Sequence, residues 1–299
     1  MQFTILMFFQ QLANPFLDFV SQFFTFFGES IPVIVIVLAI YWCDNKSRGF
    51  SLFMTLASSL IFVNIIKPIF HVARPFVKHP EIQGKRISTA TGFSFPSGHT
   101  TTASTFYTSL ALGTKNKKRW ITAAIVLSVI VGISRMYLGV HWPTDVLAGF
   151  IIGLLASFLL YNFFTNFFEH KSCEITCLVV GLLCLVTSIT FTVILTLNPE
   201  LKINFSDLMK SLALTTGGLL GVYWDKTKIN FSTSGSLGKK AVRFLVGLIG
   251  LLIISCIKFL FPGNLYFIGS LLKYSLIGLW ATALFPFIAI KLNLMNHEN

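Results

Sequence analysis

The sequence predicts an all-α fold, a polytopic transmembrane helix bundle, and three observations support this. Of 299 residues, 54% are hydrophobic and 11% are charged, so most of the chain has little water-facing surface to offer. The mean hydropathy is +0.76. Nine stretches with few charges approach the roughly 20 residues that a helical span needs, and they lie near 30–43, 50–66, 97–113, 120–140, 143–168, 174–197, 208–224, 241–262 and 265–290.

The chain before the first of these spans has a different pattern. Residues 3–27 are rich in Phe and Leu, but polar residues and a proline interrupt them at Gln10, Gln11, Asn14, Pro15 and Asp18. This pattern favours an interfacial amphipathic helix over a true span. A cleaved signal peptide is disfavoured, because the segment has no basic start.

Polar residues between the apolar stretches divide the sequence into three predicted parts. Residues 1–28 form the N-terminal interfacial helix, and residues 29–198 form a core of six spans. Residues 199–299 follow Asn198-Pro199 and form an extension of about three spans, with no ionisable cluster of the kind that chemistry needs. We therefore expect the functional site in the core.

The net charge is +12, and the basic residues that produce it are distributed according to the predicted membrane topology. Alternate loops collect the basic residues Lys46, Arg48, Lys115, Lys117, Lys118, Arg119, Lys171, Lys226, Lys228, Lys239, Lys240, Arg243 and Lys291. The positive-inside tendency makes that side cytoplasmic, and the pattern excludes nucleic acid as the partner. Residues 67–86 are the basic exception on the other side, which indicates function.

Neither cysteines nor glycines indicate a further partner. Cys43, Cys173, Cys177, Cys184 and Cys256 lie in or beside spans or on the cytoplasmic side, so no disulfide framework is expected. Two glycine pairs with four-residue spacing favour close helix packing over a homo-oligomer interface, and they are Gly149 with Gly153 and Gly217 with Gly221. Membrane lipids are the expected surroundings.

Three short segments hold the polar residues that a membrane protein does not keep without reason. They are 67–75, which contains Lys67 and Arg74, 96–99, and 134–145. The first follows the second span, the next opens the third span, and the last joins the fourth span to the fifth. All three therefore lie on the face opposite the basic loops.

Together these segments suit a phosphate dianion. Lys67, Arg74 and Arg135 supply positive charge, and arginine forks bind phosphate oxygens with two bonds. Ser97 and Gly98 open a helix, where backbone N–H groups and the helix dipole favour an anion. The same donors would stabilise the charge that develops during phosphoryl transfer.

Two histidines remain for the chemistry. His141 and Asp145 are four residues apart, so the carboxylate can hold one ring nitrogen while the other attacks phosphorus. His99 lies among the phosphate donors, where it can protonate the leaving group and then activate water. Each feature also has a purely structural interpretation. Ser97 could cap a helix, Arg74 and Arg135 could reach the interface with their side chains, and His141 with Asp145 could be a structural ion pair. Because all of them are expected on one membrane face, catalysis is favoured.

A metal hydrolase is the chemical competitor. His71, His79, His99 and His141 could all reach the outer face. Two-metal phosphatases need clustered carboxylates, and Asp145 has only Glu81 as an acidic neighbour in these segments. We therefore predict no metal and no cofactor.

These segments resemble the signature of the type 2 phosphatidic acid phosphatase superfamily, which reads K-x6-R-P, P-S-G-H and S-R-x5-H-x3-D. The resemblance covers roughly residues 29–198 and departs at no charged or catalytic position. It implies that His141 is the nucleophile, Asp145 its partner and His99 the acid. It also implies that phosphate is bound by Lys67, Arg74, Ser97, Gly98 and Arg135.

The resulting hypothesis is a metal-independent lipid phosphatase of the bacterial plasma membrane, with its site on the extracytoplasmic face. Its lipid phosphate substrate is undecaprenyl pyrophosphate, phosphatidylglycerol phosphate or phosphatidic acid, and sequence does not choose among them. The alternative is a transporter or binding protein for a lipid phosphate with the same anion pocket. The pair of His141 and Asp145 beside His99 discriminates the two, because transport needs no nucleophile.

Overall fold

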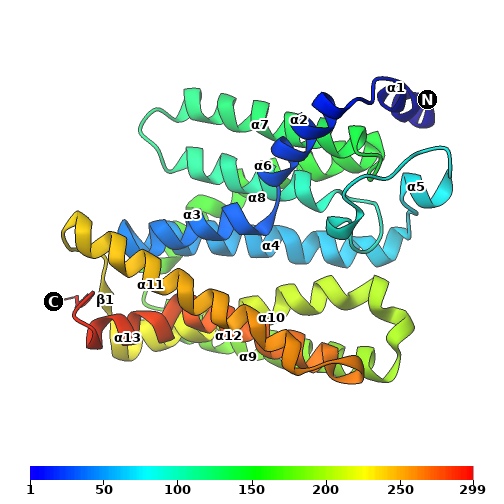
Figure 1. The fold of residues 1–299 in the computed structure, drawn as a ribbon. Coiled ribbons are helices and arrows are strands. Elements are labelled where there is room, and N and C mark those ends of the chain that lie inside the picture. The colour runs from blue at the N-terminus through cyan, green and yellow to red at the C-terminus, as the bar shows by residue number, and fades with distance from the viewer. Residues whose placement is uncertain (299) are drawn as a thin grey trace. The chain divides into compact units, whose positions relative to one another are not determined.

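The computed structural model describes residues 1–298, and the chain is mainly helical, as the sequence predicts (Figure 1). The helices are α1 (Gln2–Gln11), α2 (Pro15–Phe26), α3 (Ser30–Cys43), α4 (Lys46–Phe70), α5 (Pro75–Lys78), α6 (Gly98–Leu112), α7 (Lys117–Tyr137), α8 (Pro143–Glu169), α9 (Cys173–Leu197), α10 (Lys202–Trp224), α11 (Leu237–Ser255), α12 (Tyr266–Leu279) and α13 (Phe285–Lys291). The strands β1 (Phe231–Ser232) and β2 (Asn296–His297) form one antiparallel pair.

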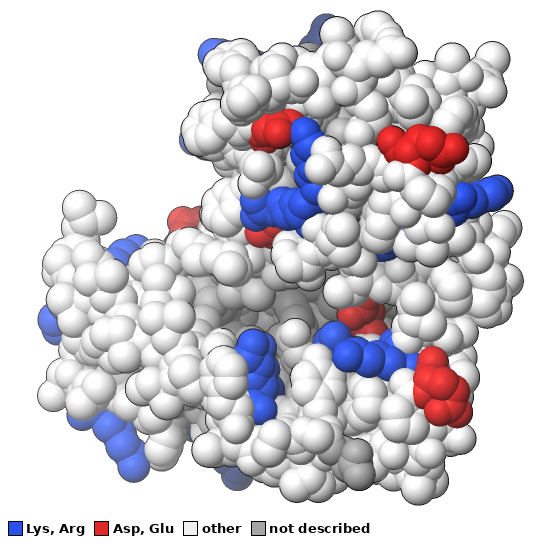
Figure 2. Space-filling view, turned by 45° about the vertical axis from the view of Figure 1, so that its right-hand side comes forward, with Lys and Arg blue, Asp and Glu red and all other residues white. Residues whose placement is uncertain are grey.

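Several of these helices can cross a bilayer. In the described part of the chain, seven helical stretches are long and apolar enough, namely Pro15–Cys43, Lys46–Lys78, Lys117–Tyr137, Pro143–Glu169, Cys173–Leu197, Leu237–Leu260 and Tyr266–Lys291. Figure 2 shows one face of the molecule, where charged side chains stand in small groups on a mostly uncharged surface. The protein is therefore an integral membrane protein with multiple spans.

Two predicted spans form helices but fall outside those seven stretches. Helix α6 occupies the stretch predicted near 97–113, but it has only 15 residues and is rich in buried Thr and Ser. Helix α10 occupies the stretch predicted near 208–224 and begins six residues earlier, at Lys202. Ser and Thr hydroxyl groups lower the hydropathy of α6. Such residues contribute to helix packing, since the Ser104 hydroxyl bonds to α8.

The N-terminal segment forms two helices where one is predicted. Asn14 caps α2 by accepting a hydrogen bond from the Leu17 backbone N–H at 2.9 Å, and Pro15 occupies the first turn. Asn and Pro at these positions favour a helix start, so α1 and α2 are separate. The interfacial location of residues 1–28 stays a prediction, and α2 belongs to the apolar stretch Pro15–Cys43.

Contacts divide the chain into two compact units, which are described separately. The first contains Met1–Ile34 and Leu52–Asn162, and the second contains Val35–Ser51 and the chain from Phe163 onward. The predicted boundary at residues 198 and 199 lies inside the second unit. It remains a sequence-based division of the chain.

In the first unit, small residues let α6 and α8 approach closely. A Cβ atom at Gly149 would lie 2.6 Å from the carbonyl oxygen of Ser97, and one at Gly153 would lie 2.6 Å from Cβ of Ser104. The Ser104 hydroxyl donates to the Phe150 carbonyl at 2.9 Å. Small residues with hydroxyl bonds are the usual means of helix packing in membranes. This packing holds the start of α6 beside the start of α8.

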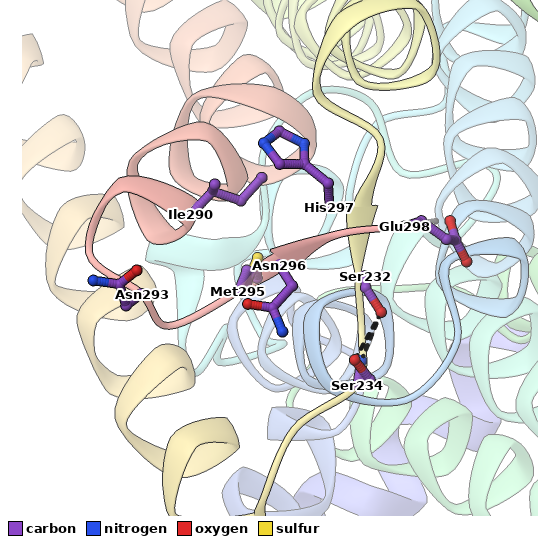
Figure 3. A pocket seen from close by; sticks show the side chains of 8 residues that line it. All are labelled: Ser232, Ser234, Ile290, Asn293, Met295, Asn296, His297 and Glu298. Atoms are coloured by element: carbon purple, nitrogen blue, oxygen red, sulfur yellow. Dashed lines mark hydrogen bonds between the residues drawn. The ribbon is translucent and has the colours of Figure 1, made fainter.

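In the second unit, α10 packs against both α9 and α12. Gly217 and Gly221 face Ser275 and Thr282, so their spacing also serves packing. The buried guanidinium of Arg243 donates to backbone carbonyls, including that of Leu294 at 2.7 Å, and so ties α11 to the C-terminal segment. The pocket beside β1 and β2 has about 570 Å³ and contains none of the predicted site residues (Figure 3).

Candidate active site

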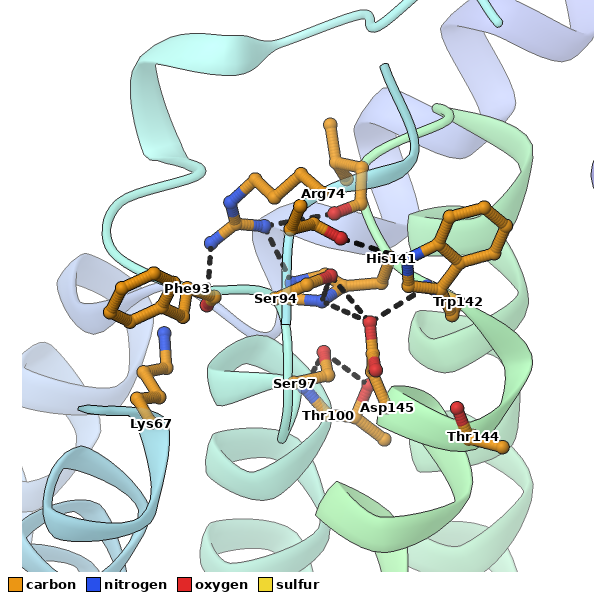
Figure 4. Close-up of polar contacts among 12 residues, drawn as sticks. Lys67, Arg74, Phe93, Ser94, Ser97, Thr100, His141, Trp142, Thr144 and Asp145 are labelled. Atoms are coloured by element: carbon orange, nitrogen blue, oxygen red, sulfur yellow. Dashed lines mark hydrogen bonds and ion pairs between the residues drawn. The ribbon is translucent and has the colours of Figure 1, made fainter. Parts of the chain in front are cut away.

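The three polar segments meet within the first unit (Figure 4). Arg74 follows the end of α4, the loop 91–97 leads into α6, and His141 lies in the turn between α7 and α8. The Ser97 backbone N–H donates to the Asp145 carbonyl at 3.0 Å, which joins the starts of α6 and α8. The structure thus brings together side chains that lie up to 78 positions apart, from Lys67 to Asp145.

Asp145 orients His141. Its Oδ2 atom accepts hydrogen bonds from the Ser94 hydroxyl at 2.5 Å and from the Trp142 backbone N–H at 2.8 Å, and it lies 3.4 Å from Nδ1 of His141. These donors fix the carboxylate, which in turn favours the tautomer with its proton on Nδ1. The Nε2 atom of His141 then keeps its lone pair, as a nucleophile requires.

The surroundings keep His141 neutral. Its side chain is almost fully buried, at 1% exposure. Burial, followed by the positive charge of Arg74, holds the pKa of His141 well below its ordinary value. A neutral imidazole is the form that can attack phosphorus, so the site is ready for nucleophilic chemistry at neutral pH.

Arg74 has a second role besides the predicted phosphate contact. Its guanidinium donates to the carbonyls of Thr91 at 2.6 Å, Val140 at 2.9 Å and Gly92 at 3.1 Å. It therefore ties the loop before α6 to the turn that carries His141. Its Nη1 atom also lies 3.2 Å from Nε2 of His141, which places a cation at the nucleophilic nitrogen.

Lys67 reaches the same loop from the last turn of α4. Its Nζ atom donates to the Thr91 carbonyl at 3.3 Å, and the residue is buried. Arg74 donates to that same carbonyl. Two of the three predicted phosphate-binding cations therefore lie side by side, and both bear on His141 electrostatically.

Arg135 is the third predicted cation, and it is fully buried. Its Nη1 atom donates to the Thr25 hydroxyl at 3.0 Å, whereas Nε and Nη2 have no hydrogen-bond partner among the described residues. Buried donors without partners are costly. Two such N–H groups on one guanidinium fork match the two oxygens of a phosphate edge.

The start of α6 provides backbone donors. Ser97 is the N-cap, and its Oγ atom accepts hydrogen bonds from the Thr100 backbone N–H at 3.5 Å and from the Thr100 hydroxyl at 3.0 Å. A Cβ atom at Gly98 would meet nothing within 4 Å. The helix start therefore has open space beside Gly98. The Ser97 N–H is paired with the Asp145 carbonyl, so the Gly98 N–H is the donor that we expect an anion to approach.

His99 follows in the first turn of α6 and faces a carboxylate. Its Nε2 atom lies 3.9 Å from Oε1 of Glu29, and within residues 1–298 that nitrogen has no hydrogen-bond partner. Burial, followed by the positive charge of Arg135, lowers the pKa of His99 to about 3, and the Glu29 carboxylate offsets part of this shift. A role as general acid therefore requires a bound phosphate dianion, whose negative charge would add to that of Glu29 and raise the pKa of His99.

The other outer histidines lie against aromatic rings. The His71 ring is 4.7 Å from that of Phe93, and the His79 ring is 4.6 Å from that of Phe3. Within residues 1–298, no three His, Cys, Asp or Glu side chains gather into a group that could hold a metal ion. The role of metal is tested by experiment below.

The structure adds residues that the sequence analysis missed. Ser94 holds Asp145, Thr25 holds Arg135, and Glu29 faces His99. Ser94 lies two residues before the polar segment 96–99, and this proximity was an available signal. Thr25 lies in the N-terminal segment and Glu29 directly follows it, and no local pattern distinguishes them from interfacial residues.

Arg135→Ala is expected to lower kcat/KM for the substrate about 10- to 150-fold, because charge-assisted hydrogen bonds worth about 1.5–3 kcal/mol are lost from the transition state. The change is measured from steady-state rates of phosphate release. Unchanged kinetics would show that Arg135 does not bind the transferring group. Thr25→Val, which removes only the hydroxyl that contacts Nη1, serves as the matched variant and should have a smaller effect.

Comparison with known proteins gives one consistent family. Residues 48–169 match the PAP2 superfamily, and residues 209–297 match the family described as PAP2 superfamily phosphatase, transmembrane extension. The chain is similar to phosphatidylglycerophosphatase B of Bacillus subtilis (strain 168), with 34% identity over 164 residues, which cover 51% of this chain and 77% of that protein.

Two further relatives have the same type of activity. Undecaprenyl-diphosphatase BcrC of Bacillus subtilis (strain 168) is 31% identical, and the match covers 50% of this chain and 76% of that protein. Lipid A 4'-phosphatase of Bacteroides thetaiotaomicron is 29% identical, with 56% and 76% covered. A solved structure of a transmembrane PAP2 type phosphatidylglycerolphosphate phosphatase from Bacillus subtilis is 30% identical, has a TM-score of 0.47, and covers 54% of this chain and 83% of that one.

Proposed function

Because this chain belongs to the PAP2 superfamily, a family of phosphatases, we propose that it hydrolyses a terminal phosphate or pyrophosphate of a lipid through a phosphohistidine at His141. One observation carries the proposal. His141 is buried and neutral, Asp145 holds its Nδ1 side, and a cation lies at its Nε2 atom. A binding pocket for phosphate needs the cations but not an oriented imidazole.

The first step transfers phosphorus to the protein. Nε2 of His141 attacks phosphorus, the Nε2–P bond forms, and the bond from phosphorus to the lipid oxygen breaks. That oxygen takes the proton of His99, which is the general acid. Arg74, Arg135, Lys67, the Ser97 hydroxyl and the Gly98 N–H hold the equatorial oxygens and stabilise their charge.

The second step releases phosphate. His99, now neutral, takes a proton from a water molecule, whose oxygen bonds to phosphorus while the Nε2–P bond breaks. Inorganic phosphate leaves, and both histidines return to their starting forms. The two reaction steps thus need no redox partner. The proton that His99 gives in the first step returns to it in the second.

The substrate class follows from the membrane setting and from the relatives. Relatives are named for phosphatidylglycerophosphate, undecaprenyl diphosphate and lipid A. We propose undecaprenyl pyrophosphate, phosphatidylglycerol phosphate or phosphatidic acid as the substrate. The positive-inside tendency of the basic loops supports a cytoplasmic location for them, so we propose that the site lies at the extracytoplasmic face of a bacterial plasma membrane, with the chemistry in residues 29–198.

A lipid panel with a chelator tests the proposal. Purified full-length protein in detergent is given each candidate lipid with excess EDTA, and released phosphate is measured. At least one lipid is expected to be hydrolysed at a rate that EDTA does not change. Hydrolysis that stops with EDTA and returns with added metal would contradict the metal-independent mechanism.

The same assay separates hydrolysis from transport. A wild-type protein that binds lipid phosphate, releases no phosphate from any candidate and moves the intact lipid across a vesicle membrane would be a transporter. The orientation of His141 by Asp145 favours hydrolysis, because a transporter gains nothing from a nucleophile.

A further inference from the structure

An open groove of about 560 Å³ runs along α2 in the first unit. It is lined by Pro15, Asp18, Phe19, Gln22, Phe23, Phe26 and Arg86. Phe19, Phe23 and Phe26 have the spacing of one helix face, and they are 69%, 52% and 40% exposed. The groove is thus an aromatic surface with a guanidinium at its edge.

The guanidinium connects this groove to the catalytic histidine. Nη2 and Nε of Arg86 lie 2.7 Å and 2.9 Å from Oε1 of Glu29. The same oxygen lies 3.9 Å from Nε2 of His99. Arg86, Glu29 and His99 are each largely but not fully buried, with side-chain exposures of 25%, 13% and 14%. A continuous line of contacts therefore leads from the groove to the start of α6.

The other charged residue of the groove is already paired. Asp18 accepts hydrogen bonds from the Tyr137 hydroxyl at 2.7 Å and from Lys85. Its carboxylate is thereby held towards Tyr137 and Lys85. Arg86 is the cation among the residues that line this groove, and its carboxylate partner Glu29 brings one negative charge.

We propose that this groove seats the part of the substrate's hydrocarbon chain nearest the phosphate, and that Arg86 is the first residue to bind the phosphate. This inference rests on the proposed lipid phosphatase function. A phosphate group offers more charge and more acceptor oxygens than a carboxylate, so it displaces Glu29 from Arg86. Glu29 then faces His99 alone and acts as a positioning residue for it.

Aromatic lining by itself would not identify the occupant, because any bilayer lipid can cover an apolar helix face. Two features favour the substrate. The lining of the groove includes a cation, Arg86, which complements a lipid phosphate, and Arg86 contacts Glu29, the residue that faces the proposed acid His99. A lipid with its chain in the groove therefore has its phosphate at the edge of the active site.

The groove is tested with paired substrates that share a headgroup and differ in chain length. Phosphate release is measured for a long-chain lipid phosphate and for its soluble short-chain counterpart. In Phe19→Ala/Phe23→Ala, the ratio of kcat/KM for the long chain to that for the short chain is expected to fall about 10-fold, because apolar contact area is lost. Phe62→Ala/Phe158→Ala is the matched control, since Phe62 and Phe158 are 51% and 50% exposed on α4 and α8.

The outcomes are separate. An unchanged ratio in the groove variant, or an equal fall in the control, would overturn the groove. Turnover of the short chain shows that each variant is folded. Wild-type protein that releases phosphate from neither substrate would refute the proposed function itself, and it is scored before any variant is compared.

Arg86 is tested by charge removal at neighbouring positions. Arg86→Gln should raise KM for both substrates about 10-fold, because a charge-assisted bond to the phosphate is lost. Lys85→Gln removes the same charge one residue away, and Lys85 pairs with Asp18 instead of Glu29. Equal KM values in Arg86→Gln and Lys85→Gln would overturn the role of Arg86.

Discussion

Replacing His141 with alanine is expected to lower kcat for the lipid substrate by roughly 10⁶-fold, the size of loss seen when another hydrolase loses its nucleophile. Nε2 of His141 is the atom that we propose bonds to phosphorus, because the residue is buried beside Arg74 and Asp145 lies at its other ring nitrogen. The loss is measured in steady-state phosphate release with the lipid at saturating concentration.

The control for this variant is a histidine outside the first unit. His170→Ala changes an exposed residue after α8, and its activity should match that of the wild type. Binding of the lipid to His141→Ala, measured by equilibrium titration, should persist because Arg74, Arg135 and Lys67 remain. A His141→Ala protein that retains more than a small fraction of wild-type kcat would contradict the nucleophile assignment.

Asp145→Asn is expected to lower kcat about 10⁴-fold, as when the orienting aspartate of a catalytic triad becomes asparagine. The amide keeps the shape of the carboxylate but can present an N–H group to His141, which favours the wrong tautomer. The carboxylate is fully buried, so solvent does not replace it. Rates of phosphate release give the size of the effect.

A structural explanation for such a loss is tested alongside. Ser94→Ala removes one hydrogen bond to the same Oδ2 atom but leaves the carboxylate, and its loss of kcat should be much smaller. Both variants should show unfolding transitions close to that of the wild type. Equal losses in Asp145→Asn and Ser94→Ala would indicate that the carboxylate only shapes the loop.

Hydropathy was enough to predict the helical class, because spans need a minimum apolar length. It was less informative where packing uses hydroxyl groups. Helix α6 has buried Ser and Thr residues that bond to α8, so its apolar signal is weak, yet Ser104 and Gly153 allow the close approach that joins the two helix starts. At the N-terminus, Asn14 and Pro15 start a second helix, which the prediction of one interfacial helix does not include.

Site residues were predictable where the residue types and their spacing in the sequence together indicate one chemical arrangement. His141 and Asp145 are an example, because a histidine and a carboxylate four residues apart can contact each other at a helix start. The fold places them with Arg74, Arg135 and His99, and their chemical roles are predictions that the variants test. Contacts between residues far apart in the sequence could not be predicted from it. Glu29 faces His99 across 70 positions of sequence, and Ser94 holds Asp145 across 51, so neither contact follows from a local period.

The covalent intermediate is the most direct test of the account. Lipid carrying a radiolabelled terminal phosphate is mixed with the protein, the reaction is quenched in base within the first turnover, and the labelled peptide is identified. The account predicts phosphate bound to His141 in the wild type and no labelled histidine in His141→Ala. Phosphate release by the wild type without label on His141, under conditions where a phosphohistidine survives, would contradict it.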